Sequence, residues 1–390
     1  MNSAQLPYSF IKKNNGIILL QAIAICILAF YMNNAAAKPF TTDTVPPSFY
    51  RGADLSFSPM LEDEQQVFYD GDKPMSTLDI FKSNGCNLVR LRLWHTPNGK
   101  NSSVQEVLAY AKRVKAAGMS ILLDFHYADN WADIMKQPIP KAWAQLNKKD
   151  MQDSLYKYTY HTIALFIANG VVPDIVQIGN EVNGGILWGA GNVSDSSENN
   201  WPYFTTLLKT GIKAVKDADK KNRIKILIQY ANLKGADRFF KRMSTYKVNY
   251  NIMGISFYPF APTNDMDQLQ KTLSSLTQKY KKNVLITETV YPFTLASNSQ
   301  AKLSLGENAK LVKNMDATPE GQKNYLLELR KRLKAIPNHR GIGFCYWAPD
   351  WVAYKGDKKA PYQSPWVNLT LFDFDHKALP ALKAFNQYAN

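Results

Sequence analysis

The chain has 390 residues and a formal net charge of +15. Its lysines are scattered as pairs, such as Lys148-Lys149 and Lys220-Lys221, without the continuous basic stripe and interleaved aromatics of a nucleic-acid surface. We therefore expect no nucleic-acid partner. The charge is best explained as a solvated surface, which could also favour approach to an acidic polysaccharide matrix.

The first 37 residues have the pattern of an export signal. Lys12-Lys13 precede an apolar run at 17–32, and the small residues that a signal peptidase requires follow at 35–37. The run is short for a bilayer span, so a cleaved signal is favoured over an uncleaved anchor helix. We expect an exported protein, periplasmic, extracellular or at the cell surface, whose mature part is residues 38–390.

Short apolar strands alternate with helical patterns along the mature part. A helix is predicted from Ser103, with apolar residues at helical spacing, to Gly118. Strands are predicted at 121–126, 171–178 and 283–287, each ending at polar residues. The predicted strand ends are Asp54, Trp94, His126, Glu181, Gln229, Tyr258, Glu288 and Trp347.

Eight strands at this spacing predict an α/β fold, a single-domain (β/α)₈ TIM barrel. Such a barrel takes roughly 250 residues, and often more with insertions. The intervals 130–170, 185–220 and 290–320 are expected to be long loops on the catalytic face. No repeat, low-complexity tract or flexible linker indicates a second module.

Several common chemistries lack their motifs in this sequence. No two of the five histidines have zinc-motif spacing, and there is neither a G-x-S-x-G segment nor a G-x-G-x-x-G segment after a strand. We therefore expect no cofactor and no metal. Cys86 and Cys345 are expected to be buried free thiols.

Two glutamates stand where predicted strands end. Glu181 follows Gly179-Asn180, and Glu288 lies between two threonines 107 residues further on. A shielded Glu181 could hold a proton for a leaving oxygen, while hydroxyl and arginine donors could keep Glu288 ionised as a nucleophile. The alternative for each is a structural ion pair. Two carboxylates at barrel strand ends are the minimum equipment for hydrolysing a glycosidic bond.

Two arginines are candidate partners for the nucleophile. Arg90 and Arg92 are two apart on one strand and so share a face, and either could pair with Glu288. The remaining inventory of carboxylates, arginines and aromatics suits sugars, whose rings stack on tryptophan and tyrosine.

The motifs at the strand ends resemble glycoside hydrolase family 53. They are the segments at 51–56, 89–94, 123–134, 178–181, 254–260 and 346–349, in order between residues 48 and 385. The resemblance implies an endo-β-1,4-galactanase that acts on type I arabinogalactan and pectin side chains. The polysaccharide would be its partner, with no stable protein partner and a monomeric state.

The resemblance also implies roles for single residues. Glu181 would be the acid/base, Glu288 the nucleophile, and Asn180 the partner of the sugar 2-hydroxyl. The other residues that would bind substrate are Asp54, Arg90, Arg92, His126, Asp129, Trp131, Trp188, Tyr258 and Trp347. The tryptophans outside the motifs, Trp143, Trp201 and Trp366, are expected in the core.

Two further expectations concern metal and stereochemistry. Bacterial relatives can hold calcium in an acidic loop after the seventh strand, but the corresponding loop 294–302 has no carboxylate, so no such site is expected. A retaining mechanism is expected, with the two carboxyls about 5 to 5.5 Å apart.

Two other functions remain open from the sequence. One is a related barrel hydrolase of the same clan acting on another β-1,4-glycan, such as mannan. The other is a non-catalytic glycan-binding barrel, although the presence of both glutamates argues against it.

Overall fold

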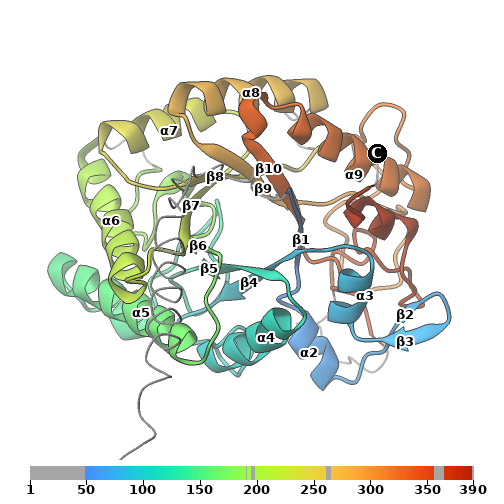
Figure 1. Cartoon of the computed structure of the whole chain (residues 1–390), viewed down its shortest axis with the longest axis horizontal. Coiled ribbons are helices and arrows are strands. Elements are labelled where there is room, and N and C mark those ends of the chain that lie inside the picture. The colour runs from blue at the N-terminus through green and yellow to red at the C-terminus, as the bar shows by residue number, and fades with distance from the viewer. Residues whose placement is uncertain (1–48, 190, 195–197, 261–264, 355–363, 389–390) are drawn as a thin grey trace, which may run out of the picture. The chain divides into compact units, whose positions relative to one another are not determined.

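A computed structural model describes residues 49–189, 191–194, 198–260, 265–354 and 364–388, and the predicted export signal lies outside them. Eight parallel strands close into a barrel (Figure 1), which confirms the predicted (β/α)₈ fold. The barrel strands are β1 (Tyr50–Asp54), β4 (Leu88–Leu93), β5 (Ser120–Phe125), β6 (Ile175–Ile178), β7 (Lys225–Ala231), β8 (Ile252–Ser256), β9 (Asn283–Thr289) and β10 (Gly341–Tyr346).

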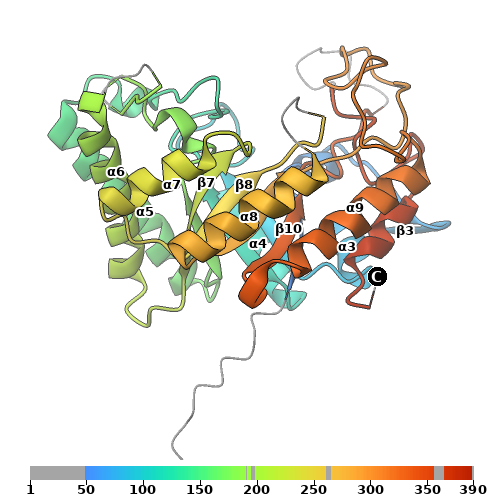
Figure 2. The ribbon, with the colours of Figure 1, turned by 90° about the horizontal axis from the view of Figure 1, so that it is seen from above.

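Helices surround the barrel, as the view of Figure 1 shows and the turned view of Figure 2 confirms. Between β1 and β4 the chain adds two short helices and a two-stranded hairpin, β2 (Phe68–Asp70) and β3 (Lys73–Met75). The helices are α2 (Ser58–Asp63), α3 (Thr77–Ser83), α4 (Val104–Ala116), α5 (Lys148–Ala168), α6 (Trp201–Ala218), α7 (Ala236–Thr245), α8 (Met266–Tyr280) and α9 (Pro319–Lys334). The short 3₁₀ helices are Lys141–Trp143, Val182–Gly184, Glu198–Asn200, Pro337–His339 and Pro380–Phe385.

The prediction that 130–170 and 185–220 are long loops is partly wrong, because each interval contains a long helix. The helix α5 starts at an Asn147 cap and buries a stripe that includes Leu155, Ile163 and Phe166, and α6 packs beside it. These stripes have the helical period, so the signal was present in the sequence. The third interval matches its prediction up to the start of α9, since the described residues between β9 and α9 form neither helix nor strand.

The barrel interior changes from apolar to polar along its strands. One buried cluster takes a residue from each of seven strands, with Tyr50 of β1 packed against it, and so must fill the inside of the barrel. It consists of Leu88, Leu122, Ile175, Leu227, Ile252, Leu285 and Ile342. Because side chains alternate, the next inward positions after Leu88 and Leu122 are Arg90 and Asp124. The apolar plug thus lies directly below a polar layer.

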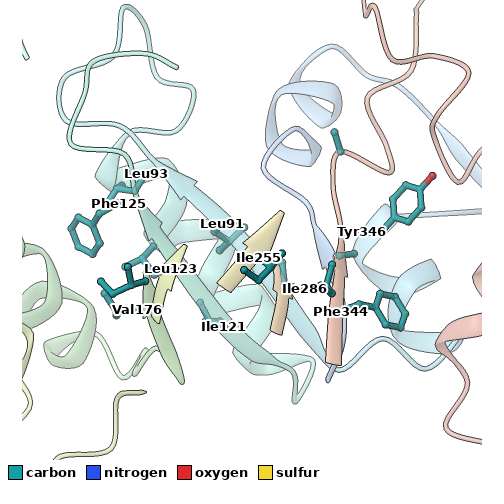
Figure 3. Packing of buried hydrophobic residues seen from close by; sticks show 14 of the residues in the cluster. Leu91, Leu93, Ile121, Leu123, Phe125, Val176, Ile255, Ile286, Phe344 and Tyr346 are labelled. Carbon is teal, nitrogen blue, oxygen red and sulfur yellow. The ribbon is translucent and has the colours of Figure 1, made fainter. Parts of the chain in front are cut away.

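The outward positions of the strands belong to a second, larger cluster. Leu91, Leu123 and Ile286 are members of it (Figure 3), together with helix residues such as Val107 and Ile163. Cys86 and Cys345 are buried free thiols, as predicted. Among the described helices, none combines the length and apolar character needed to span a bilayer.

Shortening a side chain of the interior plug tests this packing. Leu122→Ala should lower the free energy of unfolding by about 2–5 kcal/mol, because the closed barrel cannot collapse onto the vacated space. A suitable control is Leu165→Ala on α5, where the side chain is 40% exposed and the change should stay within about 0.5 kcal/mol. Urea unfolding measures both, and equal losses would contradict a rigid interior plug.

Candidate active site

Arg90 is the centre of the polar layer and contacts three carboxylates. Its Nη1 lies 2.6 Å from Asp54 Oδ2, and its Nη2 lies 2.8 Å from both Asp124 Oδ2 and Glu288 Oε1. Burial opposes the charge, but Asp124, Glu288 and Asp54 outweigh it and raise the pKa of Arg90 well above its ordinary value. Of the two candidate arginines, Arg90 is therefore the one that contacts Glu288.

Arg92 occupies a different, aromatic environment one layer higher. Its guanidinium lies 4.0 Å from the ring centre of Trp131, 4.5 Å from that of Trp94 and 4.8 Å from that of Phe57. Burial lowers its pKa to about 10, so it remains a cation at neutral pH. Arg92 therefore orders the aromatic wall of the site.

Glu288 reaches the interior through a β-bulge. Leu285 belongs to the interior plug and Ile286 to the outer cluster, so regular alternation would send Glu288 outward with Ile286. Ile255 pairs with Ile286, however, and the next residue, Ser256, pairs with Glu288. The extra residue re-aims the carboxylate into the barrel mouth, as bulges beside active sites do.

Three donors hold the Glu288 carboxylate. Besides Arg90, Gln229 Nε2 donates to Oε1 at 3.0 Å and the Tyr258 hydroxyl donates to Oε2 at 2.7 Å. The expected hydroxyl donor is thus a tyrosine, whereas the neighbouring Thr289 hydroxyl bonds with Tyr325. This environment stabilises the negative charge that a nucleophile requires.

Glu181 adopts a left-handed backbone conformation, with φ 46° and ψ 56°. Such a conformation costs a non-glycine residue roughly 1–2 kcal/mol, and here the N–H donates to Gln229 Oε1 at 2.9 Å. Burial and the nearby charge of Glu288 raise the pKa of Glu181 to about 8, while a hydrogen bond with Ser256 partly counteracts them. Glu181 therefore holds a proton at neutral pH.

Gln229 links the two glutamates directly. Its amide oxygen accepts from the Glu181 N–H and from Gln177 Nε2 at 2.5 Å, and its amide nitrogen donates to Glu288 and, at 2.9 Å, to Ser256 Oγ. Gln229 was predicted only as a strand end. The signal available in the sequence was a glutamine within an otherwise apolar run, and the structure shows that its side chain is fully buried.

Asp124, Asn180 and His126 complete the layer around Arg90. His126 Nε2 lies 3.1 Å from Asp124 Oδ2, and His126 Nδ1 accepts from the Ala132 N–H at 3.2 Å. Asn180 Oδ1 accepts from Arg90 at 2.7 Å, and its Nδ2 donates to Ala132 O at 2.8 Å, which leaves one amide hydrogen for a ligand. Sequence reasoning missed Asp124, although it interrupts a run of apolar residues.

A cleft of about 580 Å³ opens over this layer. Trp351 and Trp366, which the sequence did not assign to the site, also line it. Trp366 packs against the core as predicted, but it is only partly buried and also faces the cleft. Trp143 and Trp201 are buried, as expected. The predicted site residues that line the cleft are Arg90, Arg92, His126, Trp131, Asn180, Glu181, Tyr258, Glu288 and Trp347.

Three predicted binding residues lie outside the lining of the cleft. Asp54 supports it from below through Arg90. Asp129 lies 3.5 Å from His95 and accepts from the backbone of Thr96, and Trp188 donates to Gly184 O at 3.0 Å within its own loop. Sugar-binding roles for Asp129 and Trp188 stay predictions.

The family model for glycosyl hydrolase family 53 matches residues 50–385. The chain belongs to this family. An arabinogalactan endo-β-1,4-galactanase of Cellvibrio japonicus is 37% identical over 374 residues, which cover 94% of this chain and 96% of the relative. An endo-β-1,4-galactanase of Bacillus subtilis is 30% identical, over 87% of this chain and 86% of its own length.

Solved structures agree with this assignment. The Ignisphaera aggregans GH53 catalytic domain superposes with a TM-score of 0.82 at 34% identity, covering 89% of this chain and 98% of that domain. A structure of two fungal β-1,4-galactanases gives a TM-score of 0.74 at 28% identity, covering 86% of this chain and 98% of that chain. The family 53 chain described here is therefore a glycoside hydrolase.

At high pH, the fall in kcat/KM should follow the loss of the proton from Glu181, and this part of the pH–rate profile is called the high-pH limb below. Because its pKa is raised to about 8, kcat/KM of the family 53 hydrolase should fall as pH rises through about that value. Ser256→Ala removes a hydroxyl that favours the charged form, so the limb should move to higher pH. Rate profiles of both proteins measure this, and a limb that moves to lower pH would contradict the assigned proton.

Proposed function

We propose that this hydrolase is an exported, retaining endo-β-1,4-galactanase that cleaves the β-1,4-galactan of type I arabinogalactan and pectin side chains. The observation that carries the proposal is that one aromatic cleft holds a buried Glu181, whose pKa is raised, together with a Glu288 that accepts from Arg90, Gln229 and Tyr258. The named activities of the relatives in Cellvibrio japonicus and Bacillus subtilis support the choice of galactan.

The proposed mechanism is a double displacement. The Glu288 carboxylate attacks the anomeric carbon while Glu181 gives its proton to the leaving glycosidic oxygen. The sugar is then bonded covalently to Glu288, and Glu181 has become a carboxylate. Glu181 next takes a proton from water as that water attacks the anomeric carbon, and Glu288 leaves as a carboxylate. Two inversions give net retention.

The cleft offers groups that suit a sugar chain on either side of the cleaved bond. Trp131 and Trp347 lie with ring centres 6.0 Å apart, and Trp347 and Trp366 lie 4.8 Å apart. Such rings pack against the C–H faces of pyranoses. The second amide hydrogen of Asn180 is proposed to donate to the sugar 2-hydroxyl, and its orientation is supported by the bond to Arg90.

Export and domain organisation are part of the proposal. The charged start, the apolar run and the small residues at 35–37 support removal of residues 1–37. The mature enzyme would then be one catalytic domain, residues 38–390. We propose that it acts as a monomer.

A polysaccharide panel tests the substrate. Purified residues 38–390 should release reducing ends fastest from linear β-1,4-galactan, with β-1,4-mannan and xylan at least tenfold slower. Oligosaccharides of several lengths should appear early, since an endo-acting enzyme cuts within chains. Faster cleavage of mannan would overturn the choice of galactan but keep the hydrolase.

Two substitutions test the proposed roles. Glu288→Gln should abolish turnover of every substrate, whereas Glu181→Ala should retain activity on aryl glycosides whose leaving group needs no proton. Added azide should speed the Glu181→Ala variant by replacing water without base assistance. Proton NMR of the wild-type reaction should show the β-anomer first. Initial release of the α-anomer, or equal losses of Glu181→Ala on both substrate types, would refute the double displacement.

A further inference from the structure

Two exposed apolar side chains stand next to each other at the rim of the cleft. Ile134 is 48% exposed and Met135 is 77% exposed, and both line the cleft together with Trp131. Five large hydrophobic side chains are exposed in the described part of the chain, and only these two line the cleft. Their exposure is therefore concentrated where a ligand would cover it.

The backbone beneath these side chains forms a tight turn. Asp133 and Lys136 exchange two backbone hydrogen bonds, with N to O distances of 2.8 Å and 3.2 Å. Asp133 Oδ1 also accepts from the Met135 N–H at 2.7 Å. Because the turn is already ordered, contact with a ligand requires little further ordering of the backbone.

The same turn is tied to the segment that carries the acid. The buried Gln137 side chain donates to Asp133 O at 3.0 Å, to Asn180 O at 2.7 Å and to Glu181 O at 3.4 Å. The apolar rim is therefore fixed relative to the reacting carboxyls. A polymer that lies on the rim would be held in register with the cleft.

We propose that Ile134 and Met135 form an apolar contact for a sugar unit of the bound polysaccharide, beyond the sugars that flank the cleaved bond. The C–H face of a β-linked galactose supplies the matching apolar surface, while its hydroxyls stay in water at the rim. This inference rests on the proposed function, because it takes the substrate to be a β-linked glycan. It concerns how the enzyme selects long chains.

The rim contact acts on polymers and not on short substrates. The proposal places a distant sugar of a long galactan on the rim while the cleaved bond lies at Glu181 and Glu288, whereas an aryl glycoside of two galactose units is too short to provide that sugar. The contact is the same in the ground state and the transition state, so it lowers KM without changing kcat.

The test is a double variant, Ile134→Ser with Met135→Ser, assayed on linear galactan and on the aryl digalactoside. We expect kcat/KM on galactan to fall about 5-fold, through a higher KM, which corresponds to losing roughly 1 kcal/mol of apolar contact. The rate on the aryl substrate should stay within twofold. Met135→Leu, which keeps the apolar surface, should behave as the wild type.

The matched control is an apolar residue that is similarly exposed but lies away from the cleft. Val67 is 47% exposed and does not line the cleft, so Val67→Ser should leave both substrates unaffected. Thermal melting verifies that all variants are folded. Equal losses on the polymer and the aryl substrate, or an unchanged KM on the polymer, would overturn the rim contact.

Failure of the proposed function gives a different result. If the wild-type enzyme cleaves another glycan of the panel and not galactan, the galactanase proposal fails. The rim contact is then tested with that polymer and with a short aryl glycoside of the same sugar. Affinity electrophoresis in gels containing the polymer gives a second readout that needs no turnover, and the double variant should migrate faster than the wild type and the Val67→Ser control.

Discussion

The site depends on a buried guanidinium that is shared among carboxylates. A buried arginine is costly unless it is paired, and Arg90 meets Asp54, Asp124 and Glu288 at 2.6 to 2.8 Å. Burial is the largest cause that raises the pKa of Glu181, and the nearby charge of Glu288 adds to it, while Arg90 acts in the opposite direction. The two glutamates therefore lie in different surroundings, since Glu288 contacts the guanidinium and two further donors.

The group of charged side chains around Arg90 also depends on the apolar layer beneath it. The interior plug, which consists of seven buried apolar side chains, lies below the polar layer, and the cleft lies above it. The alternation of strand side chains then sets the order of functions along β4, where Leu88 seals the interior, Arg90 binds the carboxylates and Arg92 orders the aromatic wall. Three inward-facing residues of β4, each two positions apart, therefore have three different roles.

Much of this was predictable because barrel strands have a clear sequence pattern. All eight predicted strand ends lie within three residues of the observed ones, and the two glutamates were found from their positions at those ends. The sequence could not predict the direction of Glu288, since alternation along β9 sends it outward and only the bulge turns it inward. Nor could it predict that Gln229 joins two segments 48 and 59 residues away. Such contacts arise from barrel closure, which local patterns do not contain.

The left-handed backbone of Glu181 shows how closure and chemistry are connected. The conformation is unfavourable for a side chain with a Cβ, and it persists because Gln229 accepts the Glu181 N–H and Gln137 binds the carbonyls of the same segment. Gln229 in turn donates to Glu288, so the backbone of Glu181 and the carboxylate of Glu288 share one amide. A displacement of either glutamate would cost the hydrogen bonds of the other. The positions of the two glutamates relative to each other are therefore supported by a neutral side chain that has no exposed surface.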